Sequence, residues 1–372
     1  MFENFSVPKE LIPSDARFGV GPSLIPSSFL ESLLEVSDHL LGTSHRKPAV
    51  KSLCKELQAS MRSYFKLPKG YEIIMGNGGA TFLFDMIGLG LVKKKSLHYV
   101  CGEFSHKWYL SHKNIPWIET ELSKVDYGKG NILEAKTDAD MICCTHNETS
   151  TGVMISDFPT VDENTLLVVD ATSSAGQLKI DFNKVDVYFF SPQKIFAGEG
   201  GFFFAIMSPK ALKRADEIEK NKERFIPNIM KWGVAIENSL KHQTYNTPNI
   251  TGIFYINEQL KILNTLGADK VAELAKKKYE HIKQWVEKKD YLSFYVKEQA
   301  FQSHTVATVN VDKKFSVQEL ADKLRELKIA YDIEGYRKLG ENQLRISLFH
   351  NVSLKDLEKL TQIISLAIEG EM

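Results

Sequence analysis

The sequence has no excess of charge of either sign. Lys and Arg together number 47, and Asp and Glu also number 47, so the formal net charge at pH 7 is zero. Proteins that bind nucleic acids need an excess of Lys and Arg to contact the phosphates. The balance therefore argues against a nucleic-acid partner, and any anion that the chain binds has to meet a local basic cluster.

Cysteine is scarce and long apolar runs are absent. The cysteines are Cys54, Cys101, Cys143 and Cys144, without a CxxC pair. Such a set is a poor disulfide framework and a poor zinc site, so we expect no metal. No apolar run approaches the ~20 residues that cross a bilayer, and residues 1–5 lack the basic start of a secretory signal. These absences predict a soluble protein of the reducing cytoplasm, without a membrane partner.

What is present is an ordinary globular composition. Hydrophobic residues make up 43% and charged residues 25% of the 372 positions, and this length suits two domains around a shared cleft. Pro8 and Pro13 interrupt any regular element near the start. We therefore expect residues 1–15 to form an extended N-terminal arm.

Residues 16–260 are expected to form a large α/β domain. Short apolar runs alternate there with helical periodicities, such as those of residues 50–65 and 82–92. Runs of this kind are typical of strands in a parallel sheet that helices cover on both faces. The expected strands are residues 72–75, 96–100, 141–144, 166–169, 185–190 and 202–207.

Residues 261–372 are expected to form a smaller C-terminal α+β domain. Helical patterns at residues 252–264 and 268–288 precede a strand-like segment at residues 303–311. Two later helices begin at sequences that resemble capping boxes, namely Ser316 with Glu319 and Ser353 with Asp356.

The most informative segment is residues 165–201. One buried strand ends at Asp170, and the next runs into Ser191-Pro192-Gln193-Lys194 and a glycine-rich turn. Ligands of open α/β sheets bind at the carboxyl ends of the strands, so Asp170 and Lys194 should lie on the same rim. A lysine among apolar neighbours is favoured as the neutral amine that forms Schiff bases. An aspartate can keep a pyridine nitrogen protonated.

Each of these two residues alone has an ordinary explanation. Asp is a common helix cap and Lys is usually solvated. The combination of a strand, Asp170, small residues, a second strand and Lys194 before a glycine-rich turn is far more specific.

The second informative segment is Gly76-Asn77-Gly78-Gly79-Ala80-Thr81, between an expected strand and an expected helix. Backbone N–H groups at a helix start bind phosphate, and Thr81 adds a hydroxyl. Thr81 replaces the third glycine of a dinucleotide fingerprint, and the lysine of a P-loop is missing. The turn therefore suits a single phosphate, with a plain strand–helix turn as the alternative.

With these features in place, the chain resembles the phosphoserine aminotransferases, a group within the class V, fold-type I family of pyridoxal-phosphate enzymes. The resemblance extends over nearly the whole chain, and Ser44-His45-Arg46 and Gln193-Lys194 are its specific signals. It also includes residues 18–22, 78–81, 147–149, 170–173, 245–248, 336–340 and 342–347.

The resemblance implies a reaction and a cofactor. An amino group would move between glutamate and 3-phosphohydroxypyruvate, giving O-phospho-L-serine and 2-oxoglutarate in serine biosynthesis. The cofactor would be pyridoxal 5'-phosphate, used in a ping-pong mechanism through a Schiff base on Lys194. The large domain would hold a mostly parallel, seven-stranded sheet.

The resemblance also implies roles for individual residues. Lys194 would bind the cofactor and move the substrate proton, Asp170 would pair with the ring nitrogen, and Thr149 would bind the phenolic oxygen. The other implied cofactor contacts are Gly79, Ala80, Thr81 and Gln193 near the phosphate, Phe104 against the ring, and Asn246 and Thr247 from a neighbouring subunit.

The implied substrate residues are basic. Arg345 would clamp the α-carboxylate in the bidentate manner of a guanidinium. Arg337 of one chain with His45 and Arg46 of its partner would form the pocket for a phosphate or distal carboxylate. The active sites would then be shared in a homodimer, and a chain of zero net charge could still prefer doubly anionic substrates.

Two positions depart from many relatives. Phe104 stands where many carry a Trp that stacks on the cofactor, and Trp108, four positions further on, is the other candidate for that contact. Tyr336 stands where some relatives carry His.

Other functions are weighed against this one. An aminotransferase of small amino acids, of the alanine–glyoxylate type, would not need the basic pocket of His45 and Arg46. A cysteine desulfurase needs a reactive cysteine near the small domain, whereas all four cysteines precede residue 145. A cofactor-free Schiff-base lyase would leave Asp170 and the glycine turn without a purpose, and intact Lys194, Asp170 and Arg345 argue against a silent relative.

Overall fold

The computed structural model describes residues 2, 3 and 5–371. Its central element is a seven-stranded sheet of order β1-β9-β8-β7-β4-β2-β3. Neighbours from β3 to β8 pair in parallel, while β9 runs antiparallel to both β8 and β1. The expectation of a mostly parallel seven-stranded sheet is confirmed. The strands are β1 (Glu72–Asn77), β2 (Lys95–Val100), β3 (Glu119–Lys124), β4 (Met141–Thr145), β7 (Leu166–Asp170), β8 (Val187–Phe190) and β9 (Phe202–Met207).

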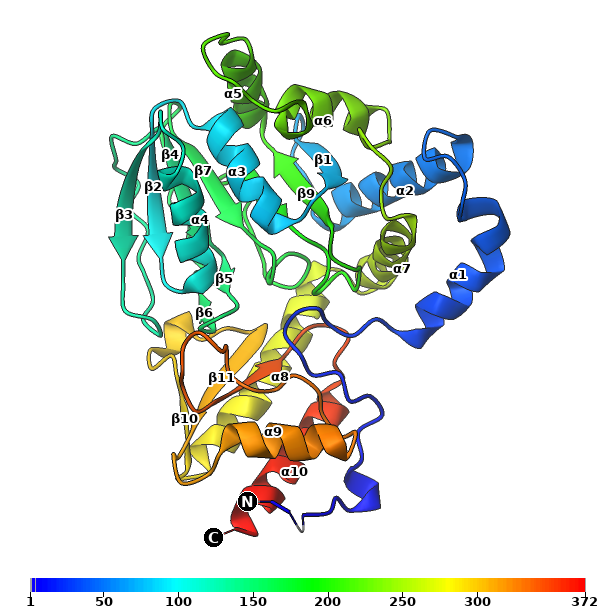
Figure 1. Ribbon diagram of the computed structural model, residues 1–372, viewed down its shortest axis with the longest axis vertical. Helices are drawn as coiled ribbons and strands as arrows, with labels where there is room; N and C mark the ends of the chain where they lie inside the picture. Colours follow the sequence, from blue (N-terminus) through cyan, green and yellow to red (C-terminus); the bar gives the residue numbers. More distant parts are fainter. Residues whose placement is uncertain (1, 4, 372) are drawn as a thin grey trace.

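Helices cover both faces of this sheet (Figure 1). Alternate side chains of β7 point to opposite faces, so that Leu167 and Val169 join one core while Leu166 and Val168 join the other. The first core is completed by α1 (Ser27–Leu40), α2 (Pro48–Tyr64) and α7 (Ile250–Leu266). The second is completed by α3 (Ala80–Leu91), α4 (Glu103–Lys113), α5 (Pro209–Glu219) and α6 (Trp232–Leu240).

A third core surrounds a three-stranded antiparallel sheet of order β10-β11-β12. Its strands are β10 (Leu292–Phe294), β11 (Val306–Val311) and β12 (Gln343–Ser347), and its helices are α8 (Ala268–Glu287), α9 (Val317–Glu326) and α10 (Leu354–Glu369). Ser316 and Ser353 cap α9 and α10, each accepting a hydrogen bond from the backbone N–H three residues on, as expected.

The start of the chain packs on this third core. Phe2 and Phe18 are fully buried in it, and Phe5, Val7 and Leu11 pack against it. The segment contains a short 3-10 helix, η1 (Lys9–Leu11), and the N-terminal end of the chain lies near the C-terminal end (Figure 1). The arm expected over residues 1–15 is therefore a packed segment, as far as its described residues show.

Some elements were not expected from the sequence. The edge strand β3 has one apolar residue, Leu122, and is largely exposed, and helices α1, α4, α5 and α6 are further elements without a sequence prediction. Helix α7 runs through residue 260 to Leu266, so the domain boundary expected at residue 260 falls inside a helix, and that division of the chain stays a prediction. In the described part of the chain, no helix is long and apolar enough to span a bilayer.

The tie between the two chain ends yields a prediction. The Asp356 carboxylate on α10 accepts hydrogen bonds from Ser14 N (2.7 Å) and Ser14 Oγ (2.6 Å). Burial raises the pKa of Asp356, but the bonds from Ser14 and Ser353 outweigh it and hold the pKa below its usual value. A lowered folded-state pKa gives stability that is present above the unfolded pKa and is lost as the pH falls through the folded pKa.

We therefore expect Asp356→Asn to lower the free energy of unfolding by about 1 kcal/mol at pH 7. The gap from wild type should close as the pH falls below about 4, where the wild-type carboxyl is also protonated. Urea unfolding between pH 3 and pH 7 measures the gap. The exposed Asp290→Asn serves as the control, and a gap for Asp356→Asn that does not depend on pH would contradict the prediction.

Candidate active site

A cavity of roughly 410 Å³ opens at the carboxyl ends of β4, β7 and β8, where open α/β sheets bind ligands. It brings together residues far apart in the sequence. Of the residues proposed from the sequence, those that line it are Gly79, Ala80, Thr81, Phe104, Thr149, Asp170, Gln193 and Lys194.

Lys194 lies in the turn after β8 and is only 7% exposed. Its Nζ donates a hydrogen bond to Thr149 Oγ1 (2.8 Å) and lies 5.5 Å from the centre of the Phe104 ring. Burial lowers the pKa of Lys194 to about 8, although the nearby Asp170 acts to raise it. The lysine therefore supplies a neutral amine far more readily than an exposed lysine would.

Gly21 makes room for that lysine. A Cβ at this position would stand 3.0 Å from Lys194 Cε, and the φ angle of 151° is one that residues with a side chain rarely adopt. Glycine is therefore the residue that allows the chain to pass so close to the amine.

Asp170 is the last residue of β7, and its carboxylate accepts hydrogen bonds from Thr172 N (2.9 Å) and Thr172 Oγ1 (2.6 Å). Burial nevertheless raises the pKa of Asp170 to about 6. A cationic N–H group in the cavity would restore the carboxylate, since a positive partner stabilises the charged form. Asp170 is thus suited to face a protonated ring nitrogen.

The glycine turn between β1 and α3 has the geometry of an anion site. Gly78 and Gly79 have φ angles of 141° and 140°, and a Cβ on Gly78 would stand 2.7 Å from the Phe82 ring. Within the described residues no side chain caps the start of α3, and the first N–H groups of a helix point out of its N-terminal end. Lys107 Nζ lies 3.3 Å from Thr81 Oγ1 and adds a positive charge beside the turn.

Several buried polar atoms at the cavity have no hydrogen-bond partner among the described residues. They include Thr145 Oγ1, Asn147 Oδ1 and Gln193 Oε1. Buried polar groups are normally satisfied, so these atoms indicate a polar ligand. An amine, a carboxylate and a phosphate turn in one cavity fit the aldehyde, ring nitrogen and phosphate of pyridoxal phosphate.

Arg345 lies on β12, in the sheet of the third core, and its side chain reaches the edge of this site. Its Nη1 donates to Thr149 O (3.4 Å), and its guanidinium lies 5.1 Å from the centre of the Tyr336 ring. Burial lowers the pKa of Arg345, and its Nε has no partner in the described part of the chain. The arginine is therefore available for a carboxylate close to Lys194.

The other residues proposed from the sequence do not line the cavity of their own chain. His45 and Arg46 lie beside the segment that carries Asn246 and Thr247, since Arg46 Nη2 donates to Tyr245 O (3.2 Å). His45 is buried, with its Nε2 lacking a partner in the part of the chain that is described. Asn77 Nδ2 donates to Thr247 O (2.7 Å). Because Asn77 belongs to the glycine turn, this group of residues lies next to that turn. Arg337 is exposed.

Only one of the two aromatic candidates for stacking faces the cavity. Phe104 lines it, whereas Trp108 is buried on the sheet side of α4, stacked on Phe84 with ring centres 5.5 Å apart. Trp108 Nε1 donates to His112 Nε2 (3.0 Å), so its one donor is used within the core.

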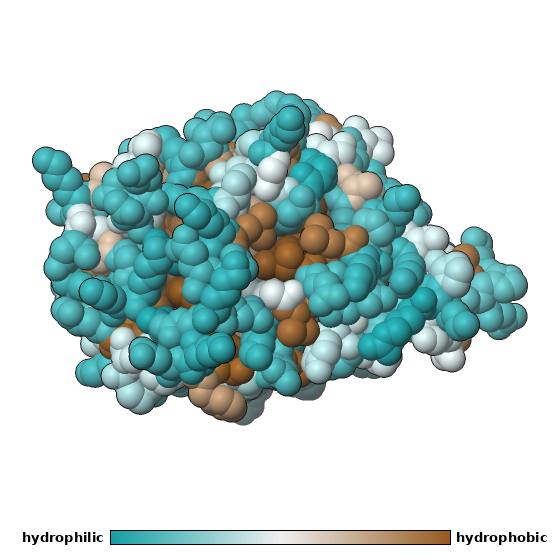
Figure 2. All heavy atoms as spheres, turned by 90° about the horizontal axis from the view of Figure 1, so that it is seen from above, coloured by the Kyte–Doolittle hydropathy of each residue, from teal (hydrophilic) through white to brown (hydrophobic). Residues whose placement is uncertain are grey.

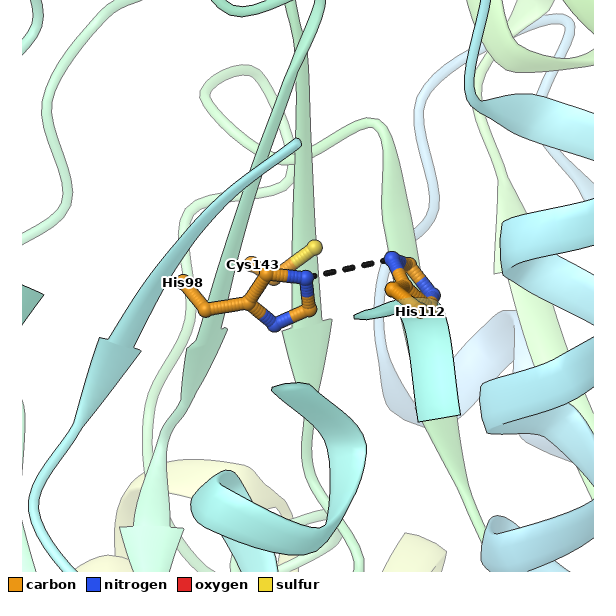
Figure 3. A group of neighbouring side chains, drawn as sticks. All are labelled: His98, His112 and Cys143. Atoms are coloured by element: carbon orange, nitrogen blue, oxygen red, sulfur yellow. Dashed lines mark hydrogen bonds between the residues drawn. The ribbon is translucent and has the colours of Figure 1, made fainter. Parts of the chain in front are cut away.

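A buried cluster behind α4 resembles a metal site in composition. His98, His112 and Cys143 bring their ligand atoms within 4.8 Å of one another (Figure 3). His112 Nε2 lies 3.0 Å from Trp108 Nε1 and 3.1 Å from Phe84 O, and His112 Nδ1 lies 3.1 Å from His98 Nε2. Burial keeps the pKa of both imidazoles low and that of the Cys143 thiol high. In this arrangement the cluster is a neutral hydrogen-bond chain that anchors α4 to β2.

Sequence reasoning missed several residues of the site. Gly21, Pro22, Thr145, Asn147, Ser191 and Gly201 line the cavity without having been proposed for it. Asn147 and Ser191 each stand two residues from a proposed position, in the same segments, and that proximity is the signal that could have found them. Lys107 lies in a helix that the sequence did not predict and carried no signal.

Comparisons with known proteins agree with this geometry. The family described as Aminotransferase class-V matches residues 124–360. A phosphoserine aminotransferase of Corynebacterium glutamicum (strain R) is 40% identical over 368 residues, which cover 98% of this chain and 97% of that protein.

Two solved structures have the same fold. A phosphoserine aminotransferase from Cytophaga hutchinsonii is 27% identical with a TM-score of 0.87, covering 94% of this chain and 98% of that chain. A phosphoserine aminotransferase from Trichomonas vaginalis with bound pyridoxal phosphate is 19% identical with a TM-score of 0.81, covering 94% and 99%.

The cavity geometry and these matches support the same conclusion. The chain belongs to the class V aminotransferase family, on the branch of the phosphoserine aminotransferases.

Proposed function

We propose that the chain is a pyridoxal-phosphate-dependent phosphoserine transaminase. It exchanges an amino group between glutamate and 3-phosphohydroxypyruvate, giving O-phospho-L-serine and 2-oxoglutarate in serine biosynthesis. The main support for the proposal is that Lys194, Asp170 and an uncapped helix start lie in one cavity. The chain is also 40% identical to a phosphoserine aminotransferase.

Pyridoxal phosphate supplies an electron-accepting ring that stabilises negative charge on the substrate α-carbon. Asp170 keeps the ring nitrogen protonated, and the N–H groups of Gly79, Ala80 and Thr81, with Gln193, hold the phosphate. Phe104 packs against the ring. Thr149, which accepts a hydrogen bond from Lys194 Nζ, is positioned to bind the phenolic oxygen.

Lys194 moves the proton of the reaction. As a neutral amine it would accept the proton of the substrate α-carbon and hold it at Nζ, and its low pKa suits both uptake and release of a proton near neutral pH. Arg345 holds the substrate α-carboxylate beside Thr149, which fixes the α-carbon near the amine.

The pocket for the second anion is completed by a partner subunit. His45, Arg46, Asn246 and Thr247 form one group outside the cavity of their own chain, which suits residues that reach across a two-fold interface to the partner's cavity. With Arg337 from the chain that holds the cofactor, the partner's His45 and the partner's Arg46 would bind the substrate phosphate, while the partner's Asn246 and the partner's Thr247 would bind the cofactor phosphate.

Exposed apolar side chains support such a homodimer. On α1, Leu34 is 74% exposed and Leu30 is also exposed, as is Leu41 directly after the helix. Seen from above, apolar side chains gather in a patch surrounded by hydrophilic ones (Figure 2). Surfaces of this kind mark contacts between proteins.

The four cysteines are free and buried, which suits work in the reducing cytoplasm.

An absorbance spectrum tests the function as a whole. We expect the purified protein, loaded with pyridoxal phosphate, to show a yellow band that O-phospho-L-serine bleaches, while L-serine and L-alanine do not. Equal bleaching by alanine would leave the chemistry intact and favour a small-amino-acid aminotransferase. A protein that stays colourless after reconstitution would overturn the proposal.

The role of Lys194 yields a second prediction. Lys194→Ala should lower kcat by more than about a thousandfold, because Lys194 is the one amine that lines the cavity in the described part of the chain and could move the proton. Pyridoxal phosphate should still bind through the phosphate turn and Asp170, but without the yellow band of wild type. Turnover close to that of wild type would contradict the assignment.

Sharing of the sites can be tested with mixed dimers. Arg46→Ala should weaken phosphoserine binding about tenfold or more while leaving the cofactor bound, because it removes one charge from the phosphate pocket. Refolding Arg46→Ala together with Lys194→Ala should then restore about one quarter of wild-type activity, since half of the dimers gain one intact site. Activity equal to the mean of the two separate variants would show that each site belongs to one chain.

A further inference from the structure

Glu148 is a buried carboxylate for which the proposed reaction has no use. It ends the short strand β5 (Asn147–Glu148), next to Thr149, and is 0% exposed. It does not line the cavity. A carboxylate buried this completely has to be balanced by donors or by positive charge, and the contacts of Glu148 show which.

The donors to this carboxylate lie in α4 and in the turn that follows β5. Oε2 accepts from Ser105 N (2.9 Å) and lies 2.9 Å from Ser105 Oγ. Oε1 accepts from Phe104 N (3.3 Å), Ser150 N (3.2 Å) and Ser150 Oγ (2.7 Å). Both oxygens are therefore fully used.

These contacts give α4 the cap that its own sequence does not provide. The residue before α4 is Gly102, which has no side chain, and the N–H groups of Phe104 and Ser105 are those that a capping side chain normally satisfies. A Cβ at Gly102 would stand 2.3 Å from Glu148 Cγ, so the absence of a side chain there makes room for the carboxylate. Its negative charge also suits the positive end of the helix dipole.

The position of Glu148 joins two parts of the cofactor cavity. On one side it holds the backbone of Phe104, whose ring lines the cavity, and on the other it is bonded to Thr149, which accepts from Lys194 Nζ. The far end of α4 is already fixed, because His112 and Trp108 lock it against the sheet. The first turn of the helix is the part that depends on Glu148.

We propose that Glu148 is a positioning residue, which caps α4 and thereby fixes the ring of Phe104 and the hydroxyl of Thr149 in the cavity that would hold pyridoxal phosphate. The inference rests on the proposed function for the cofactor contacts of these two residues. Glu148 itself acts through them.

The chemistry of the contacts dictates the test. Glu148→Gln keeps the shape of the side chain but replaces one acceptor oxygen with an NH₂ group that faces N–H and O–H donors. We expect the Kd for pyridoxal phosphate, titrated into the cofactor-free protein, to rise about tenfold. The visible circular dichroism of the bound cofactor, which reports a fixed ring, should fall, while the far-ultraviolet spectrum stays that of wild type.

A matched control separates positioning from loss of stability. Ser316→Ala removes the cap of α9, far from the cavity in the fold, and should lower the melting temperature without changing the Kd or the visible circular dichroism. If Glu148→Gln does not fold, Ser105→Ala removes one contact of Oε2 while keeping the carboxylate, and should shift the Kd in the same direction by a smaller factor.

A double-mutant cycle tests the route. Because Glu148 acts in part through Phe104, Glu148→Gln should raise the Kd by a smaller factor in a Phe104→Ala background than in wild type. Equal factors in the two backgrounds, or a Glu148→Gln protein with the Kd and visible circular dichroism of wild type, would overturn the proposal. A wild-type protein that fails to bind pyridoxal phosphate would instead refute the proposed function.

Discussion

Burial acts against the charges of Lys194 and Asp170, and the rest of the site depends on this constraint. The two groups share one cavity, and burial moves their pKa values toward neutrality, to about 8 for the lysine and about 6 for the aspartate. Each group therefore exchanges a proton far more easily than its exposed counterpart. Parallel strands bring the two groups together, because β7 and β8 are buried along their whole length and end on the same rim.

A small number of hydrogen bonds to backbone carbonyl groups hold the third core against that rim. Ser347 N donates to Phe18 O (2.9 Å), Gln177 Nε2 to Leu348 O (2.9 Å), and Thr308 Oγ1 to Thr151 O (2.8 Å). All three lie close in sequence or in space to β12, the strand that carries Arg345. The position of Arg345 relative to Lys194 thus depends on two side-chain donors, Gln177 and Thr308, as well as on the main chain.

The sequence could predict those parts of the fold and site whose signals are local. The apolar strands, the caps at Ser316 and Ser353, and the position of Asp170 and Lys194 after strands each follow from a short pattern. The polar edge strand β3 carries no such pattern, because neither of its faces is buried deeply. The approach of Arg345 to Thr149, the place of Lys107 beside Thr81 and the capping of α4 by Glu148 depend on contacts between distant segments. No periodicity within one segment encodes such contacts. Whether Phe104 or Trp108 faces the cavity depends only on the orientation of α4.

The packing of the first residues on the last helix has a consequence for synthesis of the chain. Phe2 and Phe18 are buried against residues of α10, and Ser14 is bonded to Asp356. On a ribosome that adds about 5–20 residues each second, the N-terminal segment waits tens of seconds before its binding surface exists. Gly21 of this same segment packs on Lys194, so one wall of the cavity belongs to a segment that is anchored on α10.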